Sequence, residues 1–444
     1  MIHEEPLLSV GIYQREAETR GVLNGRFVLP DKTAISGEFA VRPSEGRLVL
    51  TGSEGRELAR GPEIRLVPEG NATFTLRGVT IGINFHWERK EDETFEGGLR
   101  LLPNADGTIT AINDAGVEQY LKSVISSEMS ATAPLELLRA HAITSRSWLV
   151  AMLERQKRFK NVGGPARRGR ETADEIVRWY DREDHQLFDV CADDHCQRYH
   201  GITKIISPAA AQAVQDTRGV FLVHDGGICD ARYSKSCGGR SEKFASAWED
   251  VSVPYLESVS DAAAEHPLIA SEEAAEQWVR SSPVAYCNTN DGDILRQVLP
   301  SFDQETTDFY RWRVAYTQEE IAALLRKRSG IDFGDVRRLE PLQRGSSGRI
   351  MRLRIVGSRR TVVVGKELEI RRWLSSSHLY SSAFVVRTDE AAGGVPAKFT
   401  LHGAGWGHGV GFCQIGAAVM AAKGFEAEAI VKHYFRGAEL RKLY

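Results

Sequence analysis

The sequence predicts an α+β protein with a helical core, a β-rich N-terminal region and an inserted α+β module. Residues 1–110 alternate apolar and polar side chains in short stretches such as GRLVLTG and ATFTLRG, broken by glycine, proline and aspartate, as strands and turns do. Residues 111–155 instead repeat apolar side chains at helical spacing. A glycine-rich segment near the C-terminus then leads into a further helical pattern over 414–421.

The inserted module shows both kinds of pattern. Helical spacing occurs at 272–281 and 317–328, and strand-like runs follow at 336–343, 349–357 and 360–365. The sequence therefore predicts four parts in chain order. They are a β-rich N-terminal domain at 1–110, the first part of the core at 111–262, the module at 263–395 and the second part of the core at 396–444.

Composition limits what the chain can be. Its 444 residues, 42% hydrophobic and 26% charged, suffice for about two to three globular domains. A net charge of −3 gives no general reason to expect binding to nucleic acid or to a membrane surface. Six cysteines do not indicate a disulfide framework in a chain of this length. No transmembrane segment is expected, because no apolar run reaches the roughly 20 residues that span a bilayer.

A single carboxylate, Glu128, stands between two predicted helices. Before it, apolar side chains over 120–125 recur at helical spacing. After it, Pro134 suits the first turn of a helix, because it lacks an N–H that would be unpaired there. Arg139 and Arg146 lie about two turns apart in this second helix and therefore share a face. A half-buried carboxylate at such a break suits general acid catalysis, although a lone loop glutamate is more often a capping or solvated residue.

The glycine-rich segment holds six glycines between Gly403 and Gly416, around Trp406, His408 and Gln414. So many glycines indicate a close backbone approach or positive φ angles. The segment is not a phosphate-binding loop, because no GKS or GKT follows. It can form a sugar platform, in which the indole stacks on a sugar face while the imidazole and amide bond hydroxyls. A tight turn required only by the fold explains the glycines equally well.

A third group, His185, Cys191, His195 and Cys196, falls within twelve residues. Thiols and imidazoles are zinc ligands by type, and a Cys2His2 set makes a closed site without an open position for water. The sequence therefore favours a structural Zn²⁺ over a catalytic ion. The alternatives are reduced buried cysteines beside surface histidines, or a disulfide between the two cysteines in an oxidising compartment. Cys237 is a separate thiol, for which a place near the metal or near the cleft stays open.

Taken together, the segments resemble the stage II sporulation protein D family, also called amidase-enhancer-like proteins. Its first signature resembles YLKSVISSEM and PLELLRAHAITSRSW at 120–148, its second RYSKSCGG and the residues after it at 232–256, and its third GAGWGHGVGFCQIGA and HYFRG at 403–437. The three signatures occur in the family's order, which makes the resemblance specific. The departures from its usual residues are Arg139 for lysine, His141 for glutamine and Cys413 for serine.

The resemblance implies a peptidoglycan lytic transglycosylase that cleaves glycan strands, preferably peptide-free ones, and leaves 1,6-anhydromuramic acid ends. Glu128 would be the single catalytic acid and base. Some members of the family also carry a His–Cys–Cys zinc site where this chain has its cysteine cluster. The residues that would bind substrate are Arg139, Arg146, Tyr233, Trp406, His408 and Gln414. The alternative role for the two arginines is to orient Glu128.

Two other functions remain open at the level of the sequence. One is a non-catalytic module that binds wall glycan and stimulates an amidase, and the other is a zinc hydrolase using the Cys–His cluster. In the favoured interpretation Glu128 and the glycine-rich loop, with Tyr233 and Arg146, line one open groove. A wall substrate implies a periplasmic, cell-envelope or extracellular location, yet the first residues, MIHEEPLLSVGIY, show no signal peptide.

Overall fold

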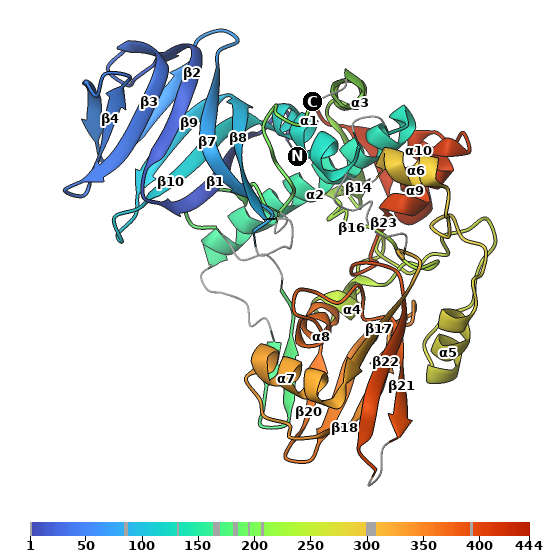
Figure 1. Cartoon of the computed structure of the whole chain (residues 1–444). Coiled ribbons are helices and arrows are strands. Elements are labelled where there is room, and N and C mark those ends of the chain that lie inside the picture. The colour runs from blue at the N-terminus through green and yellow to red at the C-terminus, as the bar shows by residue number, and fades with distance from the viewer. Residues whose placement is uncertain are drawn as a thin grey trace. The chain divides into compact units, whose positions relative to one another are not determined.

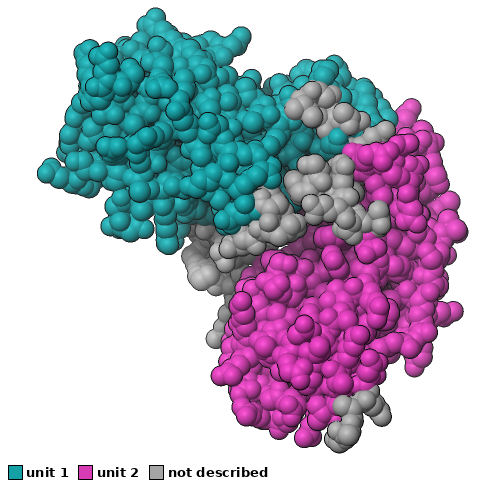
Figure 2. All heavy atoms as spheres, viewed as in Figure 1, with its two compact units in different colours: residues 1–142, 182–220, 442–444 teal, residues 143–181, 221–441 magenta. Residues whose placement is uncertain are grey.

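The computed structural model describes residues 2–83, 88–130, 133–162, 169–180, 185–193, 196–205, 208–298, 308–390 and 394–444. Helices and strands occur throughout, which confirms the α+β class. The chain divides into two compact units, coloured separately in Figure 2. Unit 1 comprises Met1–Ala142, Arg182–Val220 and Lys442–Tyr444, and unit 2 comprises Ile143–Asp181 and Phe221–Arg441.

Unit 1 is built on an eleven-stranded sheet (Figure 1). Its strand order is β13-β1-β10-β9-β6-β2-β3-β4-β5, and β7 pairs with β2 and with β8. The strands are β1 (Leu7–Glu16), β2 (Thr19–Val28), β3 (Ala34–Ser44), β4 (Arg47–Gly52), β5 (Glu57–Gly61), β6 (Ile64–Pro68), β7 (Thr73–Ile81), β8 (Arg89–Glu96), β9 (Gly98–Pro103), β10 (Ile109–Gly116) and β13 (Val190–Cys191).

The core of this sheet follows from the alternation in its sequence. Leu8, Val10 and other alternate residues of the strands are buried, as the period of two requires. The Phe74 ring packs between those of Phe27 and Phe95, with centroid distances of 6.3 and 5.3 Å. β13 pairs with β1 in parallel, with Cys191 opposite Gly11, and this pairing brings the cysteine cluster to the sheet edge.

Three helices follow the sheet in the chain. α1 (Val117–Glu128) begins directly where β10 ends, so the sheet determines where this helix starts. α2 (Leu135–Val162) begins one residue after Pro134, as predicted, and the Leu138 N–H donates to the Pro134 carbonyl at 3.1 Å. α2 crosses from unit 1 into unit 2 after Ala142. α3 (Pro208–Asp216) is the third helix.

Unit 2 contains several smaller sheets. The strand order of the largest is β11-β12-β20-β19-β18, and the others are β17-β22-β21, β15-β14-β24 and β16-β23. The strands are β11 (Gly169–Glu171), β12 (Glu175–Arg178), β14 (Val220–His224), β15 (Gly227–Ile228), β16 (Tyr233–Ser234), β17 (Arg311–Thr317), β18 (Val336–Arg344), β19 (Ile350–Gly357), β20 (Thr361–Gly365), β21 (Phe384–Glu390), β22 (Pro396–Ala404), β23 (Phe412–Cys413) and β24 (Glu439–Lys442).

The helices of unit 2 agree with the helical patterns of the sequence where these were identified. α5 and α7 occupy the two helical stretches predicted in the module. α7 has a complete capping box, in which Thr317 accepts from the Glu320 N–H and the Glu320 side chain accepts from the Thr317 N–H. The helices are α4 (Phe244–Ala247), α5 (Glu272–Arg280), α6 (Gly292–Val298), α7 (Gln318–Ser329), α8 (Glu367–Trp373), α9 (Gln414–Ala422) and α10 (Ala427–Tyr434).

The sheets of the module draw on sequence outside 263–395. β12 pairs in parallel with β20, and β22 runs from residue 396 to residue 404 between β17 and β21. β22 therefore leads directly from the sheet into the glycine-rich loop. No helix in the described ranges is both long and apolar enough to cross a membrane.

Candidate functional site

Glu128 is the last residue of α1, at the start of the break before α2, where the sequence predicts it. Its side chain is half-buried. One carboxylate oxygen, Oε1, accepts a hydrogen bond from the backbone N–H of Arg198 at 3.2 Å. The side chain is thus oriented by a backbone group 70 residues further along the chain.

His185, Cys191 and Cys196 lie together in unit 1, with their potential ligand atoms all within 4.8 Å of one another. The Cys196 Sγ is 3.4 Å from the His185 Nε2, and the Cys191 N–H donates to the same sulfur at 3.4 Å. Two thiols and an imidazole at this separation fit a tetrahedral zinc ion by donor type and spacing. His195, the predicted fourth ligand, lies outside the described residues.

The loop that carries the cysteines also carries the group that holds Glu128. Cys196 precedes Arg198 by two residues, and the Tyr199 N–H donates to the Ala192 carbonyl at 2.9 Å. The Tyr199 ring stacks on Tyr120 of α1, with a centroid distance of 5.0 Å. A ligand that holds the cysteines together would therefore also hold the Arg198 amide against the carboxylate.

The two arginines of α2 have different surroundings. Arg139 is partly exposed and forms ion pairs with Asp216 of α3 and with Glu136 of its own helix. These carboxylates raise the pKa of Arg139, mainly through the hydrogen bond with Asp216. Arg146 has no exposed surface. A residue that lines an open groove should be exposed, and Arg146 is not. Its burial suits a role in supporting the residues around it better than direct contact with a polymer.

The glycine-rich loop of unit 2 follows β22 and precedes α9. Every second residue from Gly405 to Gly411 is a glycine with a positive φ angle. A Cβ at Gly409 would lie 2.3 Å from the Arg349 guanidinium carbon, and its φ of 72° disfavours any side chain. Packing within the protein therefore accounts for these glycines without a bound sugar.

Backbone pairing joins the loop to the second signature. Tyr233 lies opposite Phe412 in the β16–β23 pair. Ser236 and Trp406 exchange backbone hydrogen bonds of 3.1 and 2.8 Å. The structure thus brings Tyr233, Trp406 and the loop together in unit 2. Tyr233 is half-buried.

Trp406 and Gln414 are less open than a sugar platform requires. One ring neighbour of Trp406 is Phe309, stacked at a centroid distance of 4.7 Å, and another is Tyr380, edge-on at 4.6 Å. The Trp406 side chain keeps partial exposure. Gln414, the first residue of α9, is only 3% exposed, so it suits a role in holding the loop.

His408 is held as a neutral hydrogen-bond donor. Its Nδ1 accepts from the Val410 N–H at 3.0 Å, and its ring meets the Trp248 ring at 4.8 Å. Burial, and then the charges of Arg232 and Arg349, keeps the pKa of His408 well below its ordinary value. The imidazole is therefore neutral at neutral pH, with its proton on Nε2. A hydrogen bond between this ring and the backbone of Tyr233 raises its pKa and offsets part of the lowering.

Sequence reasoning did not identify the residues that hold this loop in place. Arg349 is completely buried, and its guanidinium donates to the Gly407 carbonyl at 3.0 Å and to the Cys237 carbonyl at 3.1 Å. No local pattern around Arg349 indicates this contact. The Arg198 amide is a backbone group, so no residue type in the sequence indicates its contact with Glu128.

Glu128 and the His–Cys group belong to unit 1, whereas Tyr233 and the glycine-rich loop belong to unit 2. The shared groove therefore stays a prediction.

A family model described as "Stage II sporulation protein" matches residues 105–224, the segment that holds Glu128 and the His–Cys group. This segment therefore carries the stage II sporulation protein domain, and the chain is similar to stage II sporulation protein D of two Bacillus species. A second model, described as a domain of unknown function (DUF8618), matches residues 242–411.

The family relationship is distant in sequence. The stage II sporulation protein D of Bacillus amyloliquefaciens is 23% identical over 74% of this chain and 75% of its own length. An uncharacterized protein of Brachyspira hyodysenteriae is 24% identical over 85% of this chain and 78% of its own length. An amidase enhancer of Bacillus subtilis is 24% identical over 52% of this chain and 32% of its own length.

Proposed function

We propose that the protein is a peptidoglycan lytic transglycosylase in which Glu128 is the catalytic acid and base. The observation that supports this most directly is the half-buried carboxylate of Glu128 at the end of α1, held by the Arg198 amide. This residue lies in the segment matched by the stage II sporulation protein model. Similarity to that family supports a role in wall glycan processing, at the cell envelope or outside the cell.

In the proposed reaction Glu128 first donates its proton to the oxygen that bridges N-acetylmuramic acid and N-acetylglucosamine, and the bond from that oxygen to C1 of the muramic residue breaks. The muramic C6 oxygen then bonds to C1, and its proton passes to the Glu128 carboxylate. The second transfer is the reverse of the first, so one residue can perform both. Glu128 ends protonated as it began, and no water is consumed.

Within this proposal, His185, Cys191 and Cys196 would hold a zinc ion, with His195 as the fourth ligand. The ion would supply structural rigidity, as closed zinc sites do. The chain's own contribution is to hold the Arg198 amide at Glu128 through the loop that starts at the cysteines.

The second candidate function is stimulation of an amidase by a module that binds glycan without cleaving it. The similarity to an amidase enhancer favours this alternative. In that case an amidase of the cell wall is the partner, and Glu128 has no chemical role.

The test is digestion of purified, peptide-free glycan strands followed by mass analysis of the products. We expect wild type to generate 1,6-anhydromuramic acid ends. Glu128→Gln should lower the rate by about 10²–10⁴-fold, because the amide cannot transfer a proton. Glu38→Gln, the same change at an exposed position in unit 1, controls for the loss of charge.

The outcomes separate the candidates. Ordinary reducing ends would indicate attack by water and a hydrolase with a second carboxylate. Substantial cleavage by folded Glu128→Gln would remove Glu128 as the acid. Binding without cleavage by wild type, together with faster amidase turnover, would establish the amidase-stimulating module instead.

A further inference from the structure

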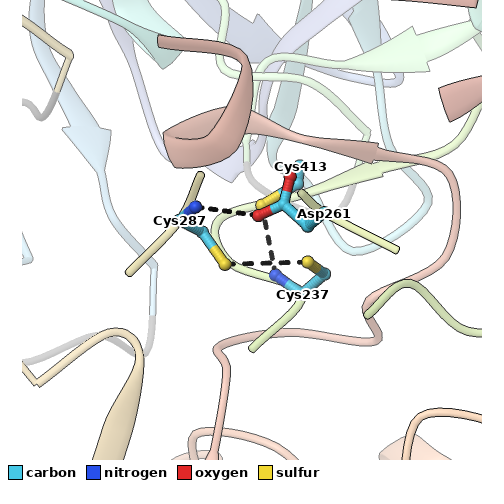
Figure 3. A group of neighbouring side chains, drawn as sticks. All are labelled: Cys237, Asp261, Cys287 and Cys413. Carbon is cyan, nitrogen blue, oxygen red and sulfur yellow. Dashed lines mark hydrogen bonds between the residues drawn. The ribbon is translucent and has the colours of Figure 1, made fainter. Parts of the chain in front are cut away.

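Four buried residues of unit 2 form a second group of metal-binding type, separate from the His–Cys group of unit 1. They are Cys237, Asp261, Cys287 and Cys413, drawn in Figure 3. Each is at most 2% exposed, and their potential ligand atoms lie within 4.8 Å of one another. None of the six cysteines of the chain forms a disulfide.

The spacing of the sulfur atoms fits a single ion. The Sγ atoms of Cys237 and Cys287 are 3.7 Å apart. Two thiolates on a tetrahedral zinc ion with Zn–S bonds of about 2.3 Å are separated by about 3.8 Å. A disulfide would require these atoms at about 2.05 Å. Ligands of a multi-iron cluster bind different iron atoms and therefore lie further apart.

The surroundings orient the four side chains toward one another (Figure 3). The Tyr434 hydroxyl donates to one Asp261 oxygen at 2.7 Å, and the Cys287 N–H donates to the other at 2.8 Å. The Cys237 N–H donates to the Cys413 sulfur at 3.2 Å. Such outer contacts are the ones that fix metal ligands in place. A Cβ at Gly416 would lie 2.3 Å from the Asp261 carboxylate, so a side chain there would displace this ligand.

We propose that Cys237, Asp261, Cys287 and Cys413 bind a structural Zn²⁺ ion. Three thiolates and a carboxylate form a closed tetrahedral set, and thiolate donors select zinc over the hard cations magnesium and calcium. Burying four such groups without a positive charge is costly, and a divalent cation offsets that cost.

The location of the site gives the ion a role. Cys237 precedes the segment matched by the second family model, and Cys413 follows it, while Asp261 and Cys287 lie inside it. The ion would thus hold together the chain just before residue 242 and the chain just after residue 411. The second of these is strand β23 (Phe412–Cys413), which lies in the glycine-rich segment. Metal binding at such a site contributes directly to folding stability.

The test uses metal analysis of protein purified under reducing conditions, incubated with ZnCl₂ and passed through gel filtration. The double variant Cys191→Ser/Cys196→Ser removes the first His–Cys group, and we expect it to retain about one zinc per chain, as one closed site holds one ion. Adding Cys287→Ser should abolish this zinc. Adding Cys229→Ser, a buried cysteine of unit 2 outside both groups, should leave it unchanged.

X-ray absorption of the zinc retained by the double variant should show three sulfur neighbours at about 2.3 Å and one oxygen at about 2.0–2.2 Å. The proposal is overturned if the double variant holds no zinc, if Cys287→Ser keeps it, or if Cys237 and Cys287 are joined as a disulfide. Where the double variant does not fold, the two substitutions are made singly in the wild-type protein. Cys287→Ser should then lower the zinc content by one ion per chain, and Cys229→Ser should leave it unchanged. None of these outcomes depends on glycan cleavage.

Discussion

His408 shows how the environment of one residue determines its chemistry. Burial lowers the pKa of its imidazole, and the nearby positive charges of Arg232, Arg349 and Arg371 lower it further. Burial likewise lowers the pKa of His433. When the pH falls below about 6.5, such histidines take up protons in the unfolded chain before they do so in the folded protein.

This difference predicts a loss of stability in acid. The folded pKa of His408 lies below the ordinary value of about 6.5, so its contribution to stability is present above about pH 6.5 and falls as the pH is lowered from there. Each such group contributes a slope of at most about 1.4 kcal/mol per pH unit.

The measurement is urea unfolding at several values between pH 7 and pH 5. His408→Asn keeps an acceptor for the Val410 N–H and removes the titrating ring, so it should lose less unfolding free energy over this range than wild type. His3→Asn, at an exposed position, controls for the substitution. Equal losses in wild type and His408→Asn would show that His408 contributes no pH dependence.

At the scale of elements, strand β13 connects the His–Cys group to the large sheet. Cys191 ends this two-residue strand and lies opposite Gly11 of β1. A Cβ at Gly11 would lie 2.4 Å from the Phe188 ring, so the sheet edge and the loop pack closely. The strand is too short to be stable on backbone pairing alone, and a metal would hold it to the edge.

We therefore expect Cys191→Ser to lower the zinc content by one ion per chain and to lower the melting temperature. The reason is that binding energy at a structural site is also folding energy. Metal analysis and thermal unfolding measure the two effects together, with Cys229→Ser as the control. Unchanged zinc content, or a Cys191–Cys196 disulfide in the purified protein, would rule out this site.

At the scale of the whole molecule, the proposed function requires unit 1 to supply the catalytic acid and unit 2 to contribute to glycan binding. Trp406 is the residue through which this requirement can be tested, because its ring keeps partial exposure beside Phe309 and Tyr380. Aromatic stacking contributes about 0.5–1.5 kcal/mol.

In the Glu128→Gln background, in which we expect binding of glycan with little cleavage, Trp406→Ala should weaken binding of peptide-free strands by roughly 2- to 10-fold on that stacking energy. Titration calorimetry measures the affinity, and circular dichroism checks the fold. Trp179→Ala, at another half-buried tryptophan of unit 2, is the matched control. Unchanged affinity in a folded Trp406 variant would leave this residue with a packing role only.

The sequence by itself determined the class of the fold, the helices on either side of Glu128 and the family. These depend on local periodicity and on short ordered signatures, which are visible without knowing what packs against them. The sequence also grouped His185, Cys191, His195 and Cys196, because these potential ligands are close together in the chain, and the structure brings His185, Cys191 and Cys196 together.

Only the tertiary structure decided which distant groups meet. It brought Cys237, Asp261, Cys287 and Cys413 together from positions spread over 176 residues, and no spacing rule indicates such a set. It also showed that Arg146 is buried and that Arg349 packs against Gly409. Burial and long-range contact depend on how whole elements pack, and the local pattern of residues does not contain that information.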